Sequence, residues 1–451
     1  MPKNTGIKFV ETKPYKAMTN AIHTNTEIAS YDYIIAGAGG AGLSLLHYLM
    51  QCSSLVSKSI LVIDKSFNKT NDRTWCFWNK DASAFETLVK NRWDTISIHA
   101  QGFDKELPTA PFSYKMIQGI DFYNAVLNKA KLKSNIHFQE ATITSISVLD
   151  SLSTSNAINV NTENSSKNIN SKESINKRAK VEWEGGSAMG SYVFSSLLPF
   201  QMNQINTAAA YSNSLQAGTS SNNKAPFLWQ HFKGRVVQFD APVFNKAIAK
   251  LMDFNVPQQG ATAFMYQLPL NEREALVEYT IFSENVLSIA EYDKVLDAYL
   301  AKAFPGATYT TTHQEIGAIP MTQIELANAQ APIYTIGALG AAIKASTGYA
   351  FQFIQEQCKN IVDQLDKGLP IQTKIHNTRH QFYDAVLLHV LFHHKMEGAE
   401  IFKRIFAKNE AATVFKFLSN TSSFLEDINI MRSLPTHIFL PAAIKVLLRR
   451  S

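Results

Sequence analysis

The fold of this chain is decided by YDYIIAGAGGAGLSLLHYLMQ, residues 31–51. The apolar run YIIA predicts a buried strand, the glycines predict a tight turn, and LSLLHYLM predicts a helix. A second apolar strand follows at SILVIDK, residues 59–65. This order of strand, turn, helix and strand predicts the opening unit of an α/β fold with a parallel sheet.

The glycines of this turn fit a phosphate-binding pattern. Gly37, Gly39 and Gly42 stand in a GxGxxG arrangement that also contains Gly40. The first glycine permits the turn, the second lets a pyrophosphate approach the backbone, and the third lets helix and strand pack closely. Asp64 closes the second strand 22 residues after Gly42, where a carboxylate can accept hydrogen bonds from ribose hydroxyls. We predict that these five residues bind a dinucleotide, but the pattern alone does not choose between FAD and NAD.

A second glycine segment, IGALGAAIKASTGYAFQ (336–352), follows a strand-like run and precedes a helical one. Flavoproteins of the glutathione-reductase type return to their cofactor with such a segment near the C-terminal end. It therefore favours FAD, with Gly337, Gly340, Thr347 and Gly348 as further cofactor-binding candidates.

The rest of the chain divides by composition and periodicity. We predict a discontinuous Rossmann-type FAD-binding domain over 31–150, 181–200 and 331–365, of the glutathione-reductase or hydroxylase type. An inserted α+β substrate domain is expected over 226–330, where GRVVQFD, TAFMYQL and ALVEYTIFS alternate like strands. Residues 366–451 read as a helical C-terminal region. Two segments are expected to be irregular: a loose extension over 1–30, and a surface loop over 151–180, where fourteen of thirty residues are Asn or Ser.

Charge and cysteine content limit the compartment and the partners. Residues 391–451 hold nine Lys or Arg against five Asp or Glu, beside apolar runs. Such a tail can lie on an anionic membrane surface or form a packed helical end. No run approaches the ~18 apolar residues of a spanning helix. The three cysteines form no CxxC pair or metal-ligand cluster, which fits a reducing cytosol. We therefore expect a cytoplasmic protein, peripheral on the inner face of the membrane, that binds neither metal nor nucleic acid.

Several motifs resemble the lycopene β-cyclase family, in particular the FAD-dependent bacterial lycopene cyclases. They are NDRTWCFWN (71–79), LMDFNV (251–256), FMYQLPL (264–270), LVEYTIFS (276–283), EIGAIPM (315–321), IGALGAAIKASTGYAFQFI (336–354), DAVLLHVL (384–391) and IFKRIFAKN (401–409). They occur in family order from about residue 31 to the end. The resemblance implies that linear ends of lycopene, an apolar carotenoid drawn from the membrane, are closed to β-rings. It also implies reduced FAD, without net redox change, and NADPH or NADH as electron source.

The same resemblance suggests where the acid and base chemistry lies. Glu278 matches the first acidic residue of the FLEET-type motif of plant relatives, but Leu276, Val277 and Tyr279 replace Phe, Leu and the second Glu. Burial among apolar neighbours would raise the pKa of Glu278 and keep it protonated. Read locally, it could equally be an edge-strand glutamate paired with a surface lysine.

Other candidates have less support. Glu315 could orient substrate, shuttle a proton or anchor a turn, and Asp253 could serve in catalysis or simply cap a loop. Arg73 could contact a cofactor phosphate or form a surface ion pair. Aromatic faces can stabilise a carbocation, and either this role or plain core packing fits Trp75, Phe77, Trp78, Phe264, Tyr266 and Phe282. The competing functions are an FAD-dependent oxidoreductase, either a hydroxylase or a prenyl reductase, and a non-catalytic carrier of apolar chains.

Overall fold

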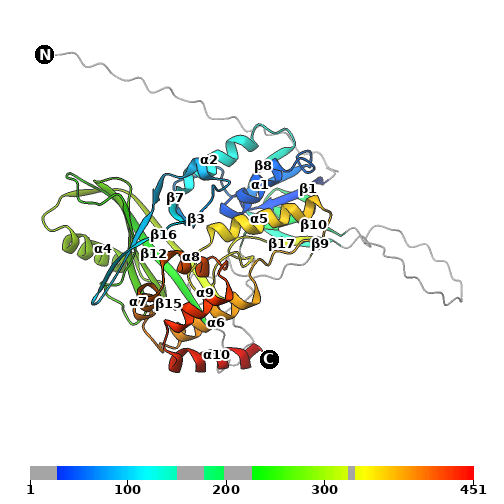
Figure 1. The fold of residues 1–451 in the computed structure, drawn as a ribbon. Coiled ribbons are helices and arrows are strands. Elements are labelled where there is room, and N and C mark those ends of the chain that lie inside the picture. Colours follow the sequence, from blue (N-terminus) through cyan, green and yellow to red (C-terminus); the bar gives the residue numbers. More distant parts are fainter. Residues whose placement is uncertain (1–27, 150–176, 198–225, 324–330, 451) are drawn as a thin grey trace, which may run out of the picture.

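The structure is a computed structural model that describes residues 28–149, 177–197, 226–323 and 331–450. Most of the predicted N-terminal extension and of the Asn/Ser-rich loop falls outside these ranges. Figure 1 shows two main bodies, one around β1 and one around β12, with a group of helices beside them.

The first sheet is built around the strand that precedes the glycine turn. Its strands are β1 (Ala29–Ala36), β2 (Ile60–Asp64), β8 (Ile136–Glu140), β9 (Ile143–Leu149), β10 (Arg178–Trp183), β11 (Gly186–Ser195) and β17 (Ile333–Thr335). Their order is β8-β2-β1-β11-β10-β9, and β17 pairs with β11. The pairs that join β8, β2, β1, β11 and β17 are parallel, whereas β9 and β10 are antiparallel. Strands from three separate parts of the sequence therefore share one sheet.

Helices cover one face of this sheet. They are α1 (Gly40–Gln51), α2 (Gly119–Ala130) and α5 (Phe351–Asp366). Tyr33 and Ile35 of β1 pack with these helices, whereas Ile34 and Ala36 pack with residues of β9 and β10. This alternation follows the two-residue period of a strand, and both faces are buried, as is usual for parallel strands. The α/β fold with a Rossmann-type opening unit is confirmed.

The second sheet has seven strands. They are β5 (Thr95–Ala100), β6 (Phe103–Pro108), β12 (Phe227–Phe239), β13 (Ile248–Asp253), β14 (Thr262–Pro269), β15 (Glu274–Ser283) and β16 (Tyr309–Thr322). Their order is β16-β12-β15-β14-β13-β5-β6, and only the β13–β5 pair is parallel. Strands β5 and β6 come from the range 31–150, which we assigned to the first domain. That assignment needs correction here, because Ile96 and Ile98 pack into the core of the second sheet.

A small third sheet connects the two larger ones. It contains β3 (Thr74–Asn79), β4 (Asn91–Trp93) and β7 (Ser113–Gln118), in the order β3-β7-β4. A short 3-10 helix, Glu86–Leu88, precedes β4.

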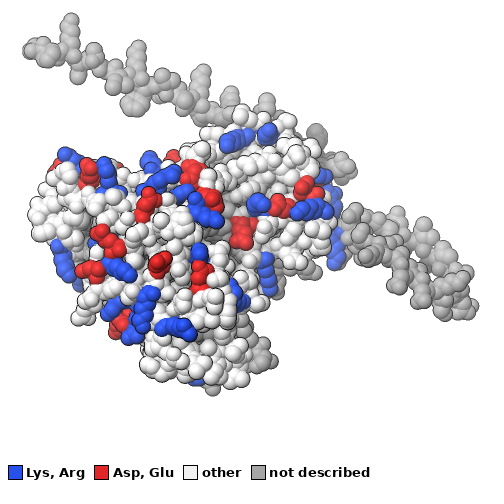
Figure 2. All heavy atoms as spheres, viewed as in Figure 1, with Lys and Arg blue, Asp and Glu red and all other residues white. Residues whose placement is uncertain are grey.

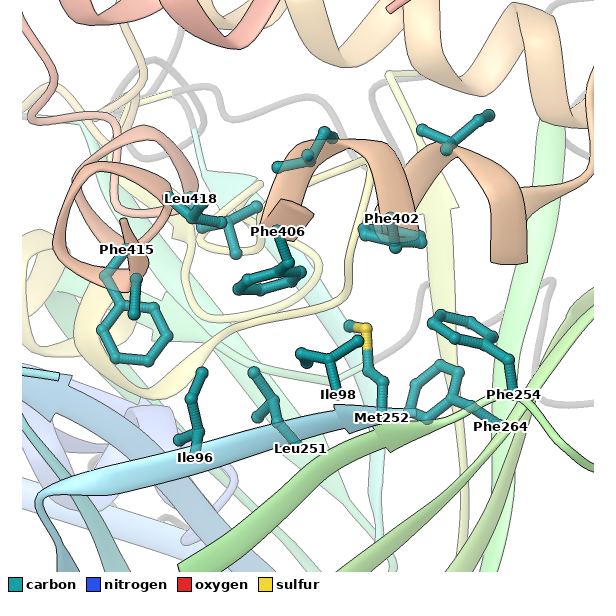
Figure 3. Packing of buried hydrophobic residues seen from close by; sticks show 14 of the residues in the cluster. Ile96, Ile98, Leu251, Met252, Phe254, Phe264, Phe402, Phe406, Phe415 and Leu418 are labelled. Atoms are coloured by element: carbon teal, nitrogen blue, oxygen red, sulfur yellow. The ribbon is translucent and has the colours of Figure 1, made fainter. Parts of the chain in front are cut away.

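The faces of the second sheet are covered differently. Helix α4 (Ile289–Ala303), which starts with a capping box between Ser288 and Glu291, packs on the outer face. The remaining helices are α6 (Thr378–Phe392), α7 (Gly398–Lys408), α8 (Ala411–Leu418), α9 (Phe424–Arg432) and α10 (Thr436–Arg450). Figure 3 shows Phe402 and Phe406 of α7 above Ile98 and Met252 of the sheet. Among the residues that the structure describes, no helix has the length and apolar character needed to cross a membrane.

Candidate active site

The first glycine turn is tightly built on its inner side and open on its outer side. Gly37 has φ +102°, and a Cβ atom on Gly42 would lie 1.9 Å from the carbonyl oxygen of Gly37. No protein atom lies within 4 Å of a Cβ placed on Gly39, which forms the N-cap of α1 without any side-chain cap. Space is therefore free beside Gly39 at the start of α1, where an anion-binding turn needs room for its ligand.

Asp64 holds the turn from the end of β2. One of its carboxylate oxygens accepts a hydrogen bond from the Ala38 N–H at 2.5 Å, and the other accepts from Lys69 Nζ at 3.0 Å. Lys69 therefore shares the carboxylate that we assigned to ribose binding.

The second glycine turn lies directly on the first. A Cβ atom on Gly337, whose φ is +69°, would approach Ala41 Cβ of α1 to 2.6 Å. A Cβ atom on Gly340 would lie 2.3 Å from the Thr335 carbonyl oxygen. The Gly337 N–H also donates a hydrogen bond to Gln357 Oε1 on α5 at 2.7 Å. Both turns thus meet at the start of α1, which is what one cofactor held by both would require.

The end of the second turn reaches the other sheet. Gly348 has φ +72°, and a Cβ atom there would lie 1.8 Å from Gln230 Oε1 of β12. Next to it, Thr347 is 4 % exposed, and its hydroxyl has no hydrogen-bond partner among the described residues. An unpaired buried hydroxyl is costly, so a ligand with a polar group at this place would satisfy it. The residues at both turns fit a dinucleotide such as FAD.

Two glutamates meet across β12. In the sheet register, Glu315 of β16, Gly234 of β12, Glu278 of β15 and Tyr266 of β14 form one row. Glu278 and Glu315 are thus separated by one strand, about 10 Å between backbones. Gly234 leaves the space between them free: a Cβ atom there would lie 3.2 Å from Glu278 Oε2 and 3.1 Å from Glu315 Cγ. The two carboxyl groups fill that space and hydrogen-bond to each other.

Two threonines hold the outer oxygens of this carboxyl pair, by which we mean Glu278 and Glu315. Thr280 Oγ1 donates to Glu278 Oε1 at 3.1 Å. Thr74 Oγ1 of β3 donates to Glu315 Oε2 at 2.9 Å, which connects the pair to the small sheet.

Burial determines which carboxyl carries the proton. It raises the pKa of Glu278 well above the usual range, and the charge of Glu315 raises it further. Burial also raises the pKa of Glu315, to about 7, while hydrogen bonds from Thr74 and Glu278 and the charge of Arg73 limit this rise. Near neutral pH, Glu278 is therefore the neutral acid that donates a hydrogen bond, and Glu315 is the one that ionises first. Such a pair can deliver one proton and accept another.

The motif NDRTWCFWN forms β3 and presents different residues on its two faces. Trp75 and Phe77 face the helices, where both rings lie against Phe351 at 5.5 and 5.0 Å. The Trp75 indole also leaves no room for a side chain at position 40, because a Cβ atom on Gly40 would lie 2.9 Å from it. Cys76 faces the other way, toward Glu278 and Glu315. Trp75 and Phe77 thus lie beside the first turn, away from the carboxyl pair.

Trp78 and Arg73 have other partners. The Trp78 ring stacks on Phe415 of α8 at 4.4 Å. Arg73 forms an exposed ion pair with Asp72 at 2.7 Å, and its charge acts on the Glu315 carboxyl. In the structure, Arg73 therefore interacts with the acidic side chains of Asp72 and Glu315.

The aromatic candidates of β14 and β15 share the sheet face of Glu278. Tyr266 lies next to Glu278 in the row, and its buried hydroxyl has no partner among the described residues. Phe264 and Phe282 pack edge to face at 5.7 Å within the apolar core under α7. Tyr266 is therefore the aromatic candidate that the structure brings to the carboxyl pair.

Asp253 lies on the opposite side of the same sheet. It pairs in register with Met265, which faces α4, and it accepts a hydrogen bond from Tyr299 of α4 at 3.0 Å. It also caps a turn through the Asn255 N–H at 3.1 Å. The structure does not bring Asp253 to the carboxyl pair. In the described ranges, no group of three His, Cys, Asp or Glu is placed to bind a metal.

Sequence reasoning missed Gly234 and Thr280. A glycine inside the strand run GRVVQFD signals a place where another group approaches the backbone closely, and this signal was available. Thr280 stands two residues after Glu278 and so shares its face of β15.

The comparison with family models gives one match. The model described as Lycopene cyclase protein covers residues 32–195 and 202–443. These ranges include both glycine turns and both members of the carboxyl pair. A search of curated proteins gave no match.

Three solved structures have the same fold at low sequence identity. A flavoprotein/dehydrogenase from Cytophaga hutchinsonii has a TM-score of 0.54 and 10% identity, and the alignment covers 94% of this chain and 100% of that one. A geranylgeranyl bacteriochlorophyll reductase-like protein from Thermoplasma acidophilum gives 0.52 and 13%, over 93% and 99%. HpxO from Klebsiella pneumoniae, as a variant complexed with FAD, gives 0.53 and 11%, over 87% and 98%. These likenesses concern the fold, whereas the family match covers nearly the whole sequence, so the chain belongs to the lycopene cyclase protein family.

Proposed function

We propose that this protein is a lycopene β-cyclase that converts the linear ends of lycopene to β-ionone rings, with FAD in a non-redox role. The observation that carries the proposal is the buried carboxyl pair, because cyclisation needs an acid and a base and no net electron transfer. Family membership supports the carotenoid substrate, and the two joined glycine turns support FAD.

The carboxyl pair can supply both proton steps. Glu278, held neutral by burial, protonates the terminal double bond and leaves a tertiary carbocation. The neighbouring alkene attacks this cation and closes the ring. Glu315, the carboxylate of the pair, accepts the proton that the ring loses, and it returns a proton to Glu278 through their hydrogen bond. Substrate and product are isomers, so the pair ends as it began.

The cofactor has a supporting place in this scheme. Reduced FAD, once bound, supplies negative charge near the cation, and NADPH or NADH serves to keep it reduced. Gly37, Gly39, Gly42, Gly337 and the Thr347 hydroxyl are the groups that would hold it.

The direct experiment is expression in a lycopene-accumulating bacterium, followed by chromatography of the pigments. We expect β-carotene in place of lycopene. Unchanged lycopene in cells that contain the soluble, FAD-loaded protein would overturn the proposal.

A redox flavoenzyme acting on an apolar substrate is the second candidate, because the similar solved structures include a reductase-like protein. Reductant consumption distinguishes the two. The purified cyclase should form many rings per NAD(P)H consumed, whereas a hydroxylase uses one NAD(P)H for each hydroxylation and a reductase one for each double bond that it reduces.

Binding of FAD can be tested separately at Gly39. Gly39→Val should give a folded but colourless protein, since no protein atom lies within 4 Å of the added Cβ and only a ligand would meet it. Flavin absorbance of the purified protein measures this, with circular dichroism as the control for folding. Retention of FAD at the wild-type level would contradict this assignment of the turn.

A further inference from the structure

The helices of the C-terminal region enclose an apolar cavity of about 260 Å³. Its lining is mainly aliphatic and aromatic and includes Phe382, Val386, Phe417, Met431, Leu440 and Ala443. Met431 and Leu440 are 41 % and 55 % exposed, whereas Ser346 and Asp384, which also line the cavity, are buried. The cavity thus extends from the surface of α9 and α10 to a buried polar group.

That polar group belongs to the second glycine turn. Asp384 of α6 accepts hydrogen bonds from Ser346 Oγ and from the fully buried Lys344 Nζ, both at 2.7 Å. Gly348, two residues beyond Ser346, lies against Gln230 of β12. Gln230 stands four residues from Gly234 on the same strand, roughly 13 Å along it. The inner wall of the cavity is therefore the segment that connects to the row of the carboxyl pair.

The outer rim of the cavity is an exposed apolar stripe on α10. Leu440, Ile444, Leu447 and Leu448 are 55 %, 49 %, 55 % and 70 % exposed. Their spacing places them on one face of the helix, within an arc of about 100°. Figure 1 shows α10 at the lower edge of the molecule, and Figure 2 shows a mostly uncharged surface there. Large apolar side chains in contact with water, here Leu440, Ile444 and Leu447, are unfavourable unless another apolar phase covers them.

The charge of this region indicates what covers the stripe. Residues 433–450 contain Lys445, Arg449 and Arg450 and no acidic residue. Basic residues beside an apolar helix face are typical of helices that lie in the interface of an anionic bilayer.

We propose that the α10 stripe docks on an anionic lipid bilayer and that the cavity beneath it is the port through which an apolar chain passes toward the carboxyl pair. This inference rests on the proposed function only for the identity of the chain. Docking and uptake are properties that do not require cyclisation.

The docking surface can be tested by sedimentation with lipid vesicles. The full-length holoprotein should bind phosphatidylglycerol vesicles at low salt, and the double variant Leu440→Glu/Leu447→Glu should bind at least tenfold more weakly. The matched control is Leu132→Glu/Ile289→Glu, at residues 85 % and 59 % exposed and remote in sequence from α10, which should bind like the wild type. Equal binding by the two double variants would overturn the docking surface. The docking surface would also be overturned if the wild-type protein were a dimer, and the α10 double variant became monomeric but still bound vesicles like the wild type.

The port requires a readout of its own. Ala443→Trp places a large ring in the cavity, and we expect it to reduce the uptake of cis-parinaric acid, a fluorescent polyene, at least fivefold. Its vesicle binding should stay at the wild-type level, which serves as the control for folding. Unchanged uptake would overturn the port. If the vesicle and uptake results hold but lycopene is not cyclised, the proposed function fails and the docking surface stands.

Discussion

The two faces of β12 carry charged groups in opposite arrangements: ion pairs on one face and two carboxyl groups on the other. On the face toward α4, Lys233 and Arg235 are neutralised by Asp293, with Arg235 Nη2 2.6 Å from the carboxylate. On the other face, the residue between them is Gly234, and two carboxyl groups meet over it with no basic side chain in hydrogen-bond contact. Opposite charges satisfy each other, whereas two buried acids can coexist only by sharing a proton. One strand thus separates a structural ion-pair face from a face that is suited to proton transfer.

The largest effect is expected from removing the acid of the carboxyl pair. Glu278→Gln keeps the shape and can still donate a hydrogen bond to Glu315, but it cannot give up a proton. Cyclisation should fall by roughly 10²–10⁴-fold, while flavin absorbance stays at the wild-type level. Pigment analysis measures the first quantity and spectroscopy the second.

Glu284→Gln provides the control, because Glu284 follows β15 directly and is exposed. It should cyclise like the wild type. Normal product yield from Glu278→Gln would remove Glu278 from the mechanism.

Titration of Glu315 should appear in both rate and stability. The proposed reaction needs Glu315 ionised and Glu278 protonated, so the rate should rise as pH increases through about 7 and fall once Glu278 ionises. Because the folded protein holds the Glu315 proton more tightly than the unfolded chain, the free energy of unfolding should decrease with rising pH between the ordinary glutamate pKa and about 7. The decrease is on the order of 3 kcal/mol.

Glu315→Gln should remove that pH dependence of stability, as measured by urea unfolding at several pH values. It should also abolish the rise of the rate near neutral pH. A variant whose unfolding free energy still decreases over the same range would place the titrating group elsewhere.

A substitution at Gly234 tests whether the spacing of the two carboxyl groups is what makes this face of β12 suited to proton transfer. The added methyl group in Gly234→Ala would lie 3.0–3.2 Å from Leu276, Glu315 and Glu278 and should push the carboxyls apart. We expect cyclisation to fall about tenfold or more, as misplacement of catalytic groups by even about 1 Å is costly. The rise of the cyclisation rate with pH near neutrality should also disappear, because the two carboxyl groups would no longer share a proton.

The control for Gly234→Ala is Val237→Ala on the α4 face. Val237 is fully buried, so its truncation should lower stability by ~2 kcal/mol without altering the carboxyl pair. If both variants lose activity in proportion to their loss of stability, the effect of Gly234→Ala is a general loss of folding, and Gly234 does not set the spacing of the carboxyl pair.

Local sequence patterns identified both members of the carboxyl pair, but not that the two meet. The alternation in ALVEYTIFS and the family resemblance pointed to Glu278, and EIGAIPM pointed to Glu315. That they meet depends on β15 and β16 both pairing with β12, which is a non-local register and has no local sequence signal. Local patterns likewise identified both glycine turns, but not that Gly337 touches Ala41.

The structure also separates residues that the sequence analysis had grouped, and the separation has a physical pattern. Trp75 and Phe77 were grouped with Trp78 as possible substrate contacts, although neighbouring residues of a strand point to opposite faces. At Asp253 this period is interrupted: the register of β13 shifts between Lys250 and Asp253, and Asp253 pairs with Met265 on the α4 face. The pairing of β5 with β13 joins segments some 150 residues apart, and only the folded chain reveals it.

The smallest effect is expected on the α4 face. Asp297→Asn removes one of the two carboxylates that pair with Arg235, at a side chain 60 % exposed. Because Arg235 keeps Asp293 and the lost pair is open to solvent, the free energy of unfolding should change by less than about 1 kcal/mol. Cyclisation, FAD content and the pH profile should remain those of the wild type, as measured by pigment yield, absorbance and urea unfolding. A loss of activity comparable to that of Gly234→Ala would mean that charge on one face of β12 controls the proton on the other, and that the two faces do not act independently.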